Sequence, residues 1–209
     1  MTFIPKNYTI YTMAKYKFKL LAADIAECAV FVALMIGGAF IKIPFPFMPL
    51  TFQTVFAVLA GLLLGWKKGM LSMTAYAVMG LIGIPVFTSG GGIFYVTMPS
   101  FGYILGFIAS AGVAGIAQSG KNRLWKTLLL AVAAFLADYV FGIAYFIAVW
   151  QLNGYAGLWH AVVTYNFVYM PKDAVLCVLA GFLAFAVTPA IKKIRGKGTA
   201  KASAEKTAK

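Results

Sequence analysis

Two acidic side chains lie in or beside long apolar stretches of this chain, and they are the first candidates for chemistry. Asp138 falls inside the segment FLADYVFGIAYF, and Asp173 follows Lys172 at the start of the last apolar stretch. An ionisable side chain within a membrane is costly unless it is paired or used. A carboxylate can accept hydrogen bonds from the N–H groups of a ligand, and a lysine can bind a negatively charged end of the same ligand.

Two interpretations of Asp173 are open. Pro171 at the first helical position, with an acidic residue in the first turn, is a common helix N-terminus. Alternatively, the carboxylate points into the protein and binds a ligand. Neighbouring residues on a helix diverge by about 100°, so Lys172 and Asp173 contact one ligand only if Lys172 reaches around from the preceding loop.

Asp138 also has two interpretations. It is either part of a proton or ion relay, or a carboxylate that is hydrogen-bonded or faces the cytoplasm. A relay usually involves several ionisable groups, which favours the second interpretation. Further ligand contacts are predicted from polar residues near the same end of the apolar stretches, although each could equally be a packing residue or a hydrogen bond between helices: Gln53, Tyr103, Tyr145 and Asn166.

Patterns typical of enzymes are absent. The sequence contains no HExxH, GxSxG or Walker phosphate-binding motif and has a single histidine, so we predict no catalytic residue, metal or cofactor. Cys28 and Cys177 have no CxxC or Cys/His spacing, and both fall in apolar stretches. They are expected to be small packing residues.

The composition is that of an integral membrane protein. Of the 209 residues, 62% are hydrophobic and 11% are charged, which is more apolar surface than a soluble domain of this size encloses. Six apolar stretches approach the length that crosses a bilayer. We therefore predict an all-α protein with six transmembrane helices, at about 22–41, 50–66, 69–87, 101–118, 127–151 and 174–191.

The positive charges predict the orientation of these helices. Lys and Arg concentrate in the cytoplasmic loops of membrane proteins. Of the 18 basic residues, only Lys42 and Lys172 fall on the other side if both termini are cytoplasmic. This topology explains the net charge of +13 without nucleic-acid binding. We expect a basic cytoplasmic segment at 1–20 that is not a cleaved signal peptide, a transmembrane domain at 21–195, and a disordered basic tail at 196–209.

The longest connections all fall on the predicted external side, at about 42–49, 84–100 and 152–171. The first contains three prolines, which cannot continue an ordinary helix, and the second contains the run Gly90–Gly92 between two prolines. Loops of this length in a compact protein are typical of binding loops or lids. They are either the roof of a pocket or plain turns at helix ends.

Small residues at four-residue spacing occur on the first helix as Ala22 and Ala26, and as Ala29 and Ala33. Such rows let helices approach closely in lipid. This alanine face packs inside the protein or docks another membrane subunit. Two classes of function remain: a ligand-binding membrane subunit, and a self-contained proton- or ion-coupled carrier that uses Asp138 and Asp173.

One long segment carries a family resemblance. The stretch IPFPFMPLTFQTVFAVLAGLLLGWKKGMLSMTAYAVMGLIGIPVF, followed by MPSFGYILGF, resembles the BioY family, the biotin-specific substrate-binding components of energy-coupling factor transporters. The resemblance implies a six-helix fold in the bacterial plasma membrane that binds biotin from outside. It further implies a transmembrane coupling protein and two cytoplasmic ATPases as partners, with docking through the alanine face.

The resemblance also implies roles for residues at the start of the last helix. Asp173 occupies the acidic position of the family, where a lysine commonly follows three residues later. Leu176 stands at that lysine position in this chain. Our hypothesis is that Lys172 supplies the missing charge.

Overall fold

The computed structural model describes residues 22–44, 49–118 and 123–207, with side chains up to residue 193. The regular elements in this part of the chain are helical, which confirms the all-α class. The long helices are α2 (Ala22–Phe40), α3 (Gln53–Leu64), α4 (Trp66–Leu81), α5 (Phe101–Gly115), α6 (Leu124–Leu152) and α8 (Met170–Thr207). Four short segments join them: η2 (Ile93–Thr97), η3 (Ile116–Gln118), α7 (Leu158–Val162) and η4 (Val163–Phe167).

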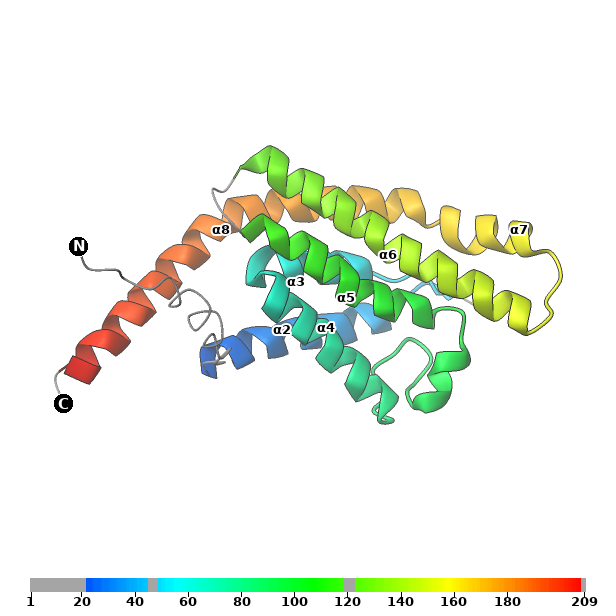
Figure 1. Cartoon of the computed structure of the whole chain (residues 1–209), viewed down its shortest axis with the longest axis horizontal. Helices are drawn as coiled ribbons and strands as arrows, with labels where there is room; N and C mark the ends of the chain where they lie inside the picture. The colour runs from blue at the N-terminus through cyan, green and yellow to red at the C-terminus, as the bar shows by residue number, and fades with distance from the viewer. Residues whose placement is uncertain (1–21, 45–48, 119–122, 208–209) are drawn as a thin grey trace, which may run out of the picture.

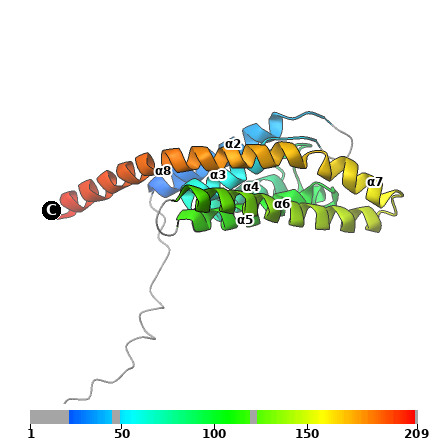
Figure 2. The same ribbon diagram turned by 90° about the horizontal axis from the view of Figure 1, so that it is seen from above.

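Helix α3 lies at the centre of the bundle. It contacts α2, α4, α5, α6 and α8, and nine of its 12 residues are buried. Figure 1 shows the long helices lying side by side along the molecule, with α8 extending beyond the others toward the C-terminus. Seen from above, α2 and α8 lie on one side of the bundle and α5 and α6 on the other (Figure 2).

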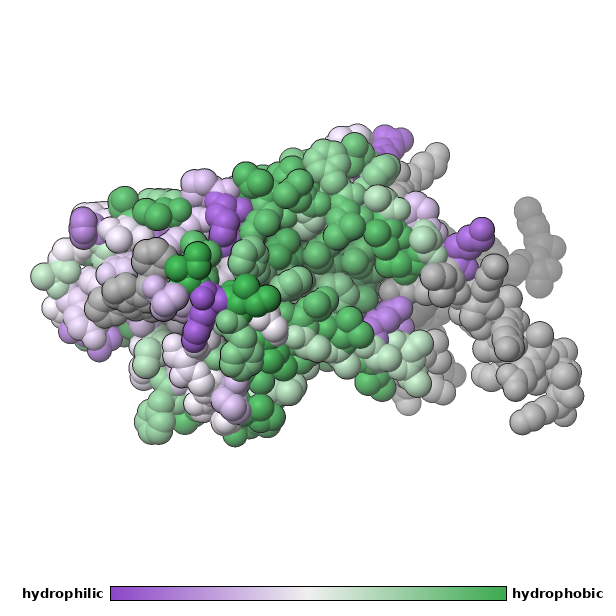
Figure 3. Space-filling view, turned by 180° about the vertical axis from the view of Figure 1, so that it is seen from behind, coloured by the Kyte–Doolittle hydropathy of each residue, from purple (hydrophilic) through white to green (hydrophobic). Residues whose placement is uncertain are grey.

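The outer surface is suited to a membrane. Four helical stretches of the described chain are long and apolar enough to cross a bilayer: Ala22–Phe40, Phe101–Gln118, Leu124–Leu152 and Leu158–Lys193. Figure 3 shows apolar residues covering the middle of one face, with hydrophilic residues toward its ends. Helices α3 and α4 have 12 and 16 residues, fewer than the roughly 20 of a typical span. The structure therefore indicates a multi-pass membrane protein, and the count of six spans stays a prediction.

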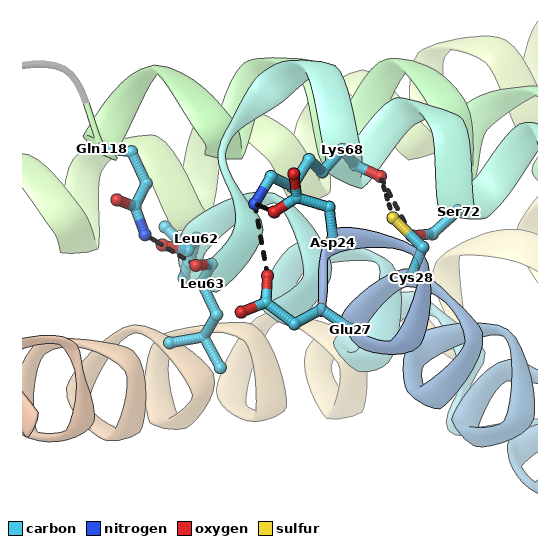
Figure 4. Close-up of polar contacts among 8 residues, drawn as sticks. All are labelled: Asp24, Glu27, Cys28, Leu62, Leu63, Lys68, Ser72 and Gln118. Atoms are coloured by element: carbon cyan, nitrogen blue, oxygen red, sulfur yellow. Dashed lines mark hydrogen bonds and ion pairs between the residues drawn. The ribbon is translucent and has the colours of Figure 1, made fainter. Parts of the chain in front are cut away.

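Helices α3 and α4 form a tight hairpin, and the turn between them lies at Gly65. Gly65 has a φ of 84°, which glycine adopts without a steric penalty. The side-chain amide of Gln118 donates hydrogen bonds of 2.9 and 2.8 Å to the carbonyl oxygens of Leu62 and Leu63 (Figure 4). These bonds satisfy two carbonyls that the end of a helix leaves without intrahelical partners.

A charged cluster joins α2 to the start of α4 at this end of the bundle. The ammonium group of Lys68 forms ion pairs with Asp24 and with Glu27, the latter at 3.3 Å (Figure 4). The backbone carbonyl of Lys68 accepts a 2.9 Å hydrogen bond from the Ser72 hydroxyl. We call Asp24, Glu27 and Lys68 the α2–α4 clasp.

The first two long connections are closed by short antiparallel bridges. Ile43 and Leu50 exchange backbone hydrogen bonds of 2.9 and 3.0 Å, so the proline-rich loop between them is pinched at its base. The tip of that loop, 45–48, lies outside the described residues. Phe87 and Gly90 close a tighter turn in the second connection in the same way. Both connections therefore contain backbone-bonded turns rather than continuous helix, as their prolines and glycines predict.

The third connection is mostly helical. After the turn around Gly157, the chain enters α7 and continues through η4, a π-helical segment, into α8. The amide of Val168 donates to the carbonyl of Val163 at 3.3 Å, the i to i+5 spacing of a π-helix. The last apolar helix therefore begins well before the predicted residue 174.

The chain also differs from the sequence prediction at its C-terminal end. Helix α8 continues to Thr207, whereas composition predicts a disordered tail from 196. Ala and Lys dominate this tail, and both have high intrinsic helix propensity. The composition is therefore compatible with helix as well as with disorder. The basic segment 1–20 lies outside the described residues.

Close packing between α3 and α5 generates a prediction about stability. A Cβ atom on Gly61 would lie 2.3 Å from the carbonyl oxygen of Ala111, whereas a Cβ on Gly37 would meet nothing within 4 Å. We expect Gly61→Ala to lower the free energy of unfolding by about 1–3 kcal/mol, because the two helices must move apart. Gly37→Ala is the matched control and should change it by less than about 0.5 kcal/mol.

The measurement is the thermal unfolding midpoint of the purified protein in detergent. A lower midpoint for Gly61→Ala with an unchanged midpoint for Gly37→Ala is expected. Equal midpoints for the two variants would contradict the close α3–α5 contact.

Candidate ligand-binding site

A pocket lies at the end of the bundle opposite the α2–α4 clasp. Residues from all three predicted external connections line it, together with residues from α3, α4, α5, α6 and α8. Seven of the lining residues are aromatic: Tyr76, Phe87, Tyr95, Tyr103, Phe107, Tyr139 and Tyr169.

The charged part of the pocket is at the start of α8. Asp173 is 6% exposed, and its Oδ2 atom accepts a 2.7 Å hydrogen bond from the Tyr139 hydroxyl. The ammonium group of Lys172 lies 2.7 Å from the other oxygen, Oδ1. This contact is an ion pair without the alignment of a hydrogen bond. Oδ1 is therefore the carboxylate oxygen that remains able to accept a hydrogen bond from a ligand.

The side chain of Lys172 reaches around α8. Lys172 and Asp173 need this geometry in order to contact one ligand at the same time. Besides contacting Asp173, the ammonium group of Lys172 donates a hydrogen bond to the backbone carbonyl of Thr51 and lies 5.2 Å from the centre of the Phe52 ring. The side chain thus spans from α8 to the segment that leads into α3. Asp173 is in the first turn of α8 and also lines the pocket, so the two interpretations of this residue do not exclude one another.

Gln53, at the start of α3, also lines the pocket. Its side-chain amide donates a 2.6 Å hydrogen bond to the hydroxyl of Tyr76 and a 3.3 Å bond to the carbonyl of Met35. The Tyr76 hydroxyl in turn donates to the carbonyl of Val86 at 3.1 Å. The pair of Gln53 and Tyr76 therefore links α2, α3 and α4 to the second long connection.

Tyr103 and Asn166 form a second hydrogen-bonded pair. Tyr103 lines the pocket, and its hydroxyl donates a 2.7 Å hydrogen bond to the Oδ1 atom of Asn166. Asn166 is fully buried in η4 and donates to the carbonyl of Val162 at 3.1 Å. It is not a lining residue, so the structure places it behind Tyr103 as a support.

Tyr145 is not brought to the pocket. Its hydroxyl donates to the backbone carbonyl of Val96, and its ring packs against Phe101 with the ring centres 5.6 Å apart. This contact joins α6 to η2. Of the six predicted ligand contacts, four line one pocket, and Asn166 and Tyr145 do not.

Several lining residues are missing from the sequence prediction. Tyr139 holds Asp173, and Tyr76 holds Gln53. Thr88 and Tyr95 form a 2.7 Å hydroxyl pair in the second connection. One signal in the sequence could have indicated these residues. Each has a hydroxyl group within or next to an apolar stretch, where the hydroxyl needs a hydrogen-bond partner.

Asp138 lies in the interior of the bundle. It is fully buried, so it does not face the cytoplasm. The Thr54 side chain is the hydrogen-bonding group beside it, although among the described residues neither carboxylate oxygen has a well-aligned hydrogen-bond partner. The expectation of a hydrogen-bonded carboxylate therefore stays a prediction. Cys28 and Cys177 form no disulfide bond. Both are buried, as expected of small packing residues.

Ala22, Ala26, Ala29 and Ala33 of α2 are all exposed in the isolated chain. Ala29 and Ala33 line an apolar groove between α2 and α4, together with Ile25, Cys28, Val32, Ile36, Leu71, Ala75 and Met79. We call these nine residues the α2–α4 groove. The alanine face is thus directed outward and is not used for packing within the described chain.

Comparison with known proteins identifies the family. The model of the BioY family matches residues 11–193. A biotin transporter BioY of Thermotoga maritima is 32% identical over 163 residues, covering 77% of this chain and 93% of the relative. A protein of Lysinibacillus sphaericus, described as "Probable biotin transporter BioY", is 55% identical over 92 residues, which cover 44% of this chain and 47% of that relative.

A solved structure has the same fold. The S-component for biotin from an ECF-type ABC transporter superposes with a TM-score of 0.67 at 23% identity, covering 79% of this chain and 90% of that one. The relatives are named as transporters, in agreement with the prediction of a transport subunit rather than an enzyme. Because the family match spans residues 11–193, well over half of the sequence, the chain belongs to the BioY family.

Proposed function

We propose that this chain captures biotin for an energy-coupling factor transporter and binds it in the pocket at the start of α8. The observation that carries the proposal is the pair of Lys172 and Asp173, a cation and an anion held 2.7 Å apart at the edge of an aromatic pocket. Membership of the BioY family supports biotin as the ligand. The relatives' names and the solved S-component support transport as the process.

The chemistry of biotin fits these groups. Its ureido ring has two N–H donors and one carbonyl, its sulfur ring is apolar, and its tail ends in a carboxylate. Oδ1 of Asp173 accepts a ureido N–H, the aromatic walls contact the fused rings, and Lys172 binds the tail. Gln53 and Tyr103 lie close enough to the pocket to complete the hydrogen bonding of the ureido group.

Lys172 takes the role of the lysine that the family pattern places at the position of Leu176. Leu176 does not line the pocket, whereas Lys172 does. On binding, the biotin carboxylate replaces Asp173 as the partner of Lys172, and the ureido N–H replaces Lys172 as the partner of Asp173. The ligand thus exchanges one internal ion pair for two charge-assisted contacts.

Transport requires partners, and α2 supplies a surface for them. The α2–α4 groove is apolar and includes Ala29 and Ala33, whose small side chains permit close approach of a helix from another membrane protein. We assign this groove as the docking site of the coupling protein. Two cytoplasmic ATPases bind to the coupling protein. In this arrangement six helices cross the bacterial plasma membrane, both termini are cytoplasmic, and the pocket opens to the outside.

Titration of the purified, biotin-free protein with biotin in a calorimeter tests the capture function. We expect saturable binding of about one biotin per chain, without ATP or an ion gradient, because the pocket is formed in the chain alone. Asp173→Asn should weaken binding by about 10- to 100-fold, since a charge-assisted hydrogen bond is lost. Glu27→Gln, a change of the same type in the α2–α4 clasp at the other end of the bundle, is the control and should leave affinity unchanged. Absence of heat from folded protein would contradict the proposal.

The role of Lys172 is tested with two ligands. Lys172→Met should lower the affinity for biotin about tenfold more than the affinity for an analogue without the carboxylate, because only biotin loses a charged partner. Lys42→Met is the matched control, since Lys42 donates to the carbonyl of Thr88 at the pocket rim. It should affect both ligands equally. If Lys172→Met also weakens both ligands equally, Lys172 does not bind the tail.

The docking face is tested by two tryptophans on α2. Ala33→Trp fills the groove, whereas Val30→Trp replaces a residue that is 57% exposed and lies outside the groove. In cells that express the coupling protein and the ATPases, we expect Ala33→Trp to abolish biotin uptake and Val30→Trp to preserve it. Purified Ala33→Trp should still bind biotin. Loss of that binding would place Ala33 in internal packing instead.

A further inference from the structure

Asp138 is the one acidic side chain in the described residues that is fully buried and has no hydrogen-bond partner. It lies in α6 against Gly106 of α5. A Cβ atom on Gly106 would come within 2.2 Å of its Oδ1 atom and 2.7 Å of its backbone carbonyl. The carboxyl group is thus pressed against the backbone of the neighbouring helix, in the bundle interior directly behind the pocket.

Among the described side chains around Asp138, none carries a positive charge that is free to balance its ionised form. The titratable groups that face it come from three helices: Tyr103 of α5, Tyr139 of α6, and Asp173 and Cys177 of α8. None of these side chains carries a positive charge. The cation of this cluster is Lys172, which is already paired with Asp173 and bonded to Thr51. An unpaired carboxylate in this setting would be an isolated charge inside a membrane protein.

A metal ion does not fit the site. Among the described residues there is no group of three or more His, Cys, Asp or Glu side chains that could hold one. The contact with Gly106 leaves Oδ1 against helix backbone, without the several oxygen ligands that a hard cation requires. A proton needs no such ligand shell, and it neutralises the carboxylate within the space available.

We propose that Asp138 is a proton-binding site. It is held in the bundle as a neutral carboxylic acid, and because it is neutral, Asp173 is the only ionised carboxylate facing the pocket. The second part rests on the proposed function, since it concerns an anionic ligand. If Asp138 loses its proton, a second negative charge arises behind the pocket. That charge competes with the ligand for Lys172 and repels the ligand carboxylate.

The direction of the pH dependence follows. The proton is present at low and neutral pH, where Asp138 leaves biotin affinity undisturbed. As pH rises and the proton leaves, biotin affinity falls. The contribution of Asp138 is the difference between the pH curves of the wild type and of a variant that cannot ionise at this position.

Infrared spectroscopy tests the proton directly, without any ligand. The chain contains only five acidic side chains, so the carbonyl band of one protonated carboxylic acid can be assigned. At neutral pH we expect this band in the wild type and in Asp173→Asn, and its loss in Asp138→Asn. A combined variant with D24N, E27Q, D173N and E205Q keeps Asp138 as the only acidic side chain and should retain the band, should Asp138→Asn fail to fold. Absence of the band from the wild type, or its survival in folded Asp138→Asn, would overturn the proposal.

Biotin titrations from about pH 6 to about pH 10 test the link to the ligand. We expect Asp138→Asn, which mimics the neutral acid, to bind biotin within about threefold of the wild type at neutral pH. At the high end of the range the wild type should lose more affinity than the variant. Parallel pH curves, or a tenfold loss in the variant at neutral pH, would overturn the link. If neither protein binds biotin, the proposed function fails, and the infrared result still decides the protonation of Asp138.

Discussion

The hydrocarbon interior of a membrane offers no hydrogen bonds, and this constraint governs where the chain can place polar side chains. Asp173 is satisfied by Tyr139 and Lys172, and Gln53 by the hydroxyl of Tyr76. Tyr139 and Asp173 lie on different helices, as do Gln53 and Tyr76, so each of these two hydrogen bonds also fixes two helices relative to one another. The pocket is therefore a set of interhelical hydrogen bonds with space left between them. A ligand that enters must replace the bonds that it breaks.

The same constraint divides the bundle into two ends with different chemistry. At the pocket end, Lys42 and Lys172 each donate to a loop carbonyl, which joins the connections over the cavity. At the other end, the α2–α4 clasp joins α2 to α4, and Gln118 satisfies the end of α3. Apolar side chains and closely packed glycines such as Gly61 fill the region between. Polar contacts thus hold the ends, and close packing holds the middle.

The helices and much of the pocket could be predicted from the sequence, because both leave local signals. Apolar stretches located all six long helices, and an acidic residue next to an apolar stretch drew attention to Asp173. The partners of these residues could not be predicted. Tyr139 and Asp173 are 34 positions apart, and nothing local indicates that they meet.

The positions of other polar side chains could not be predicted for the same reason. Asn166 and Tyr145 are polar residues of the kind expected at a ligand site, yet each hydrogen-bonds to a neighbouring element. The sequence leaves the surroundings of Asp138 open, because a lone acidic residue in an apolar stretch does not show which groups it meets. Its burial depends on the absence of a side chain on Gly106 in the adjacent helix. Only the three-dimensional packing brings these two positions together.

The π-helical segment η4 sets the angular position of everything that follows it. A π turn contains one residue more than an α turn, and each residue of an α-helix corresponds to a rotation of about 100°. With that extra residue, the chain directs Asn166 inward and also Lys172 and Asp173 toward the pocket. A lineage that lost one residue here would keep a continuous apolar helix and its membrane insertion, yet would turn both charges away from the cavity. The number of residues in this segment therefore determines which side chains at the start of α8 face the cavity, independently of which amino acids occupy it.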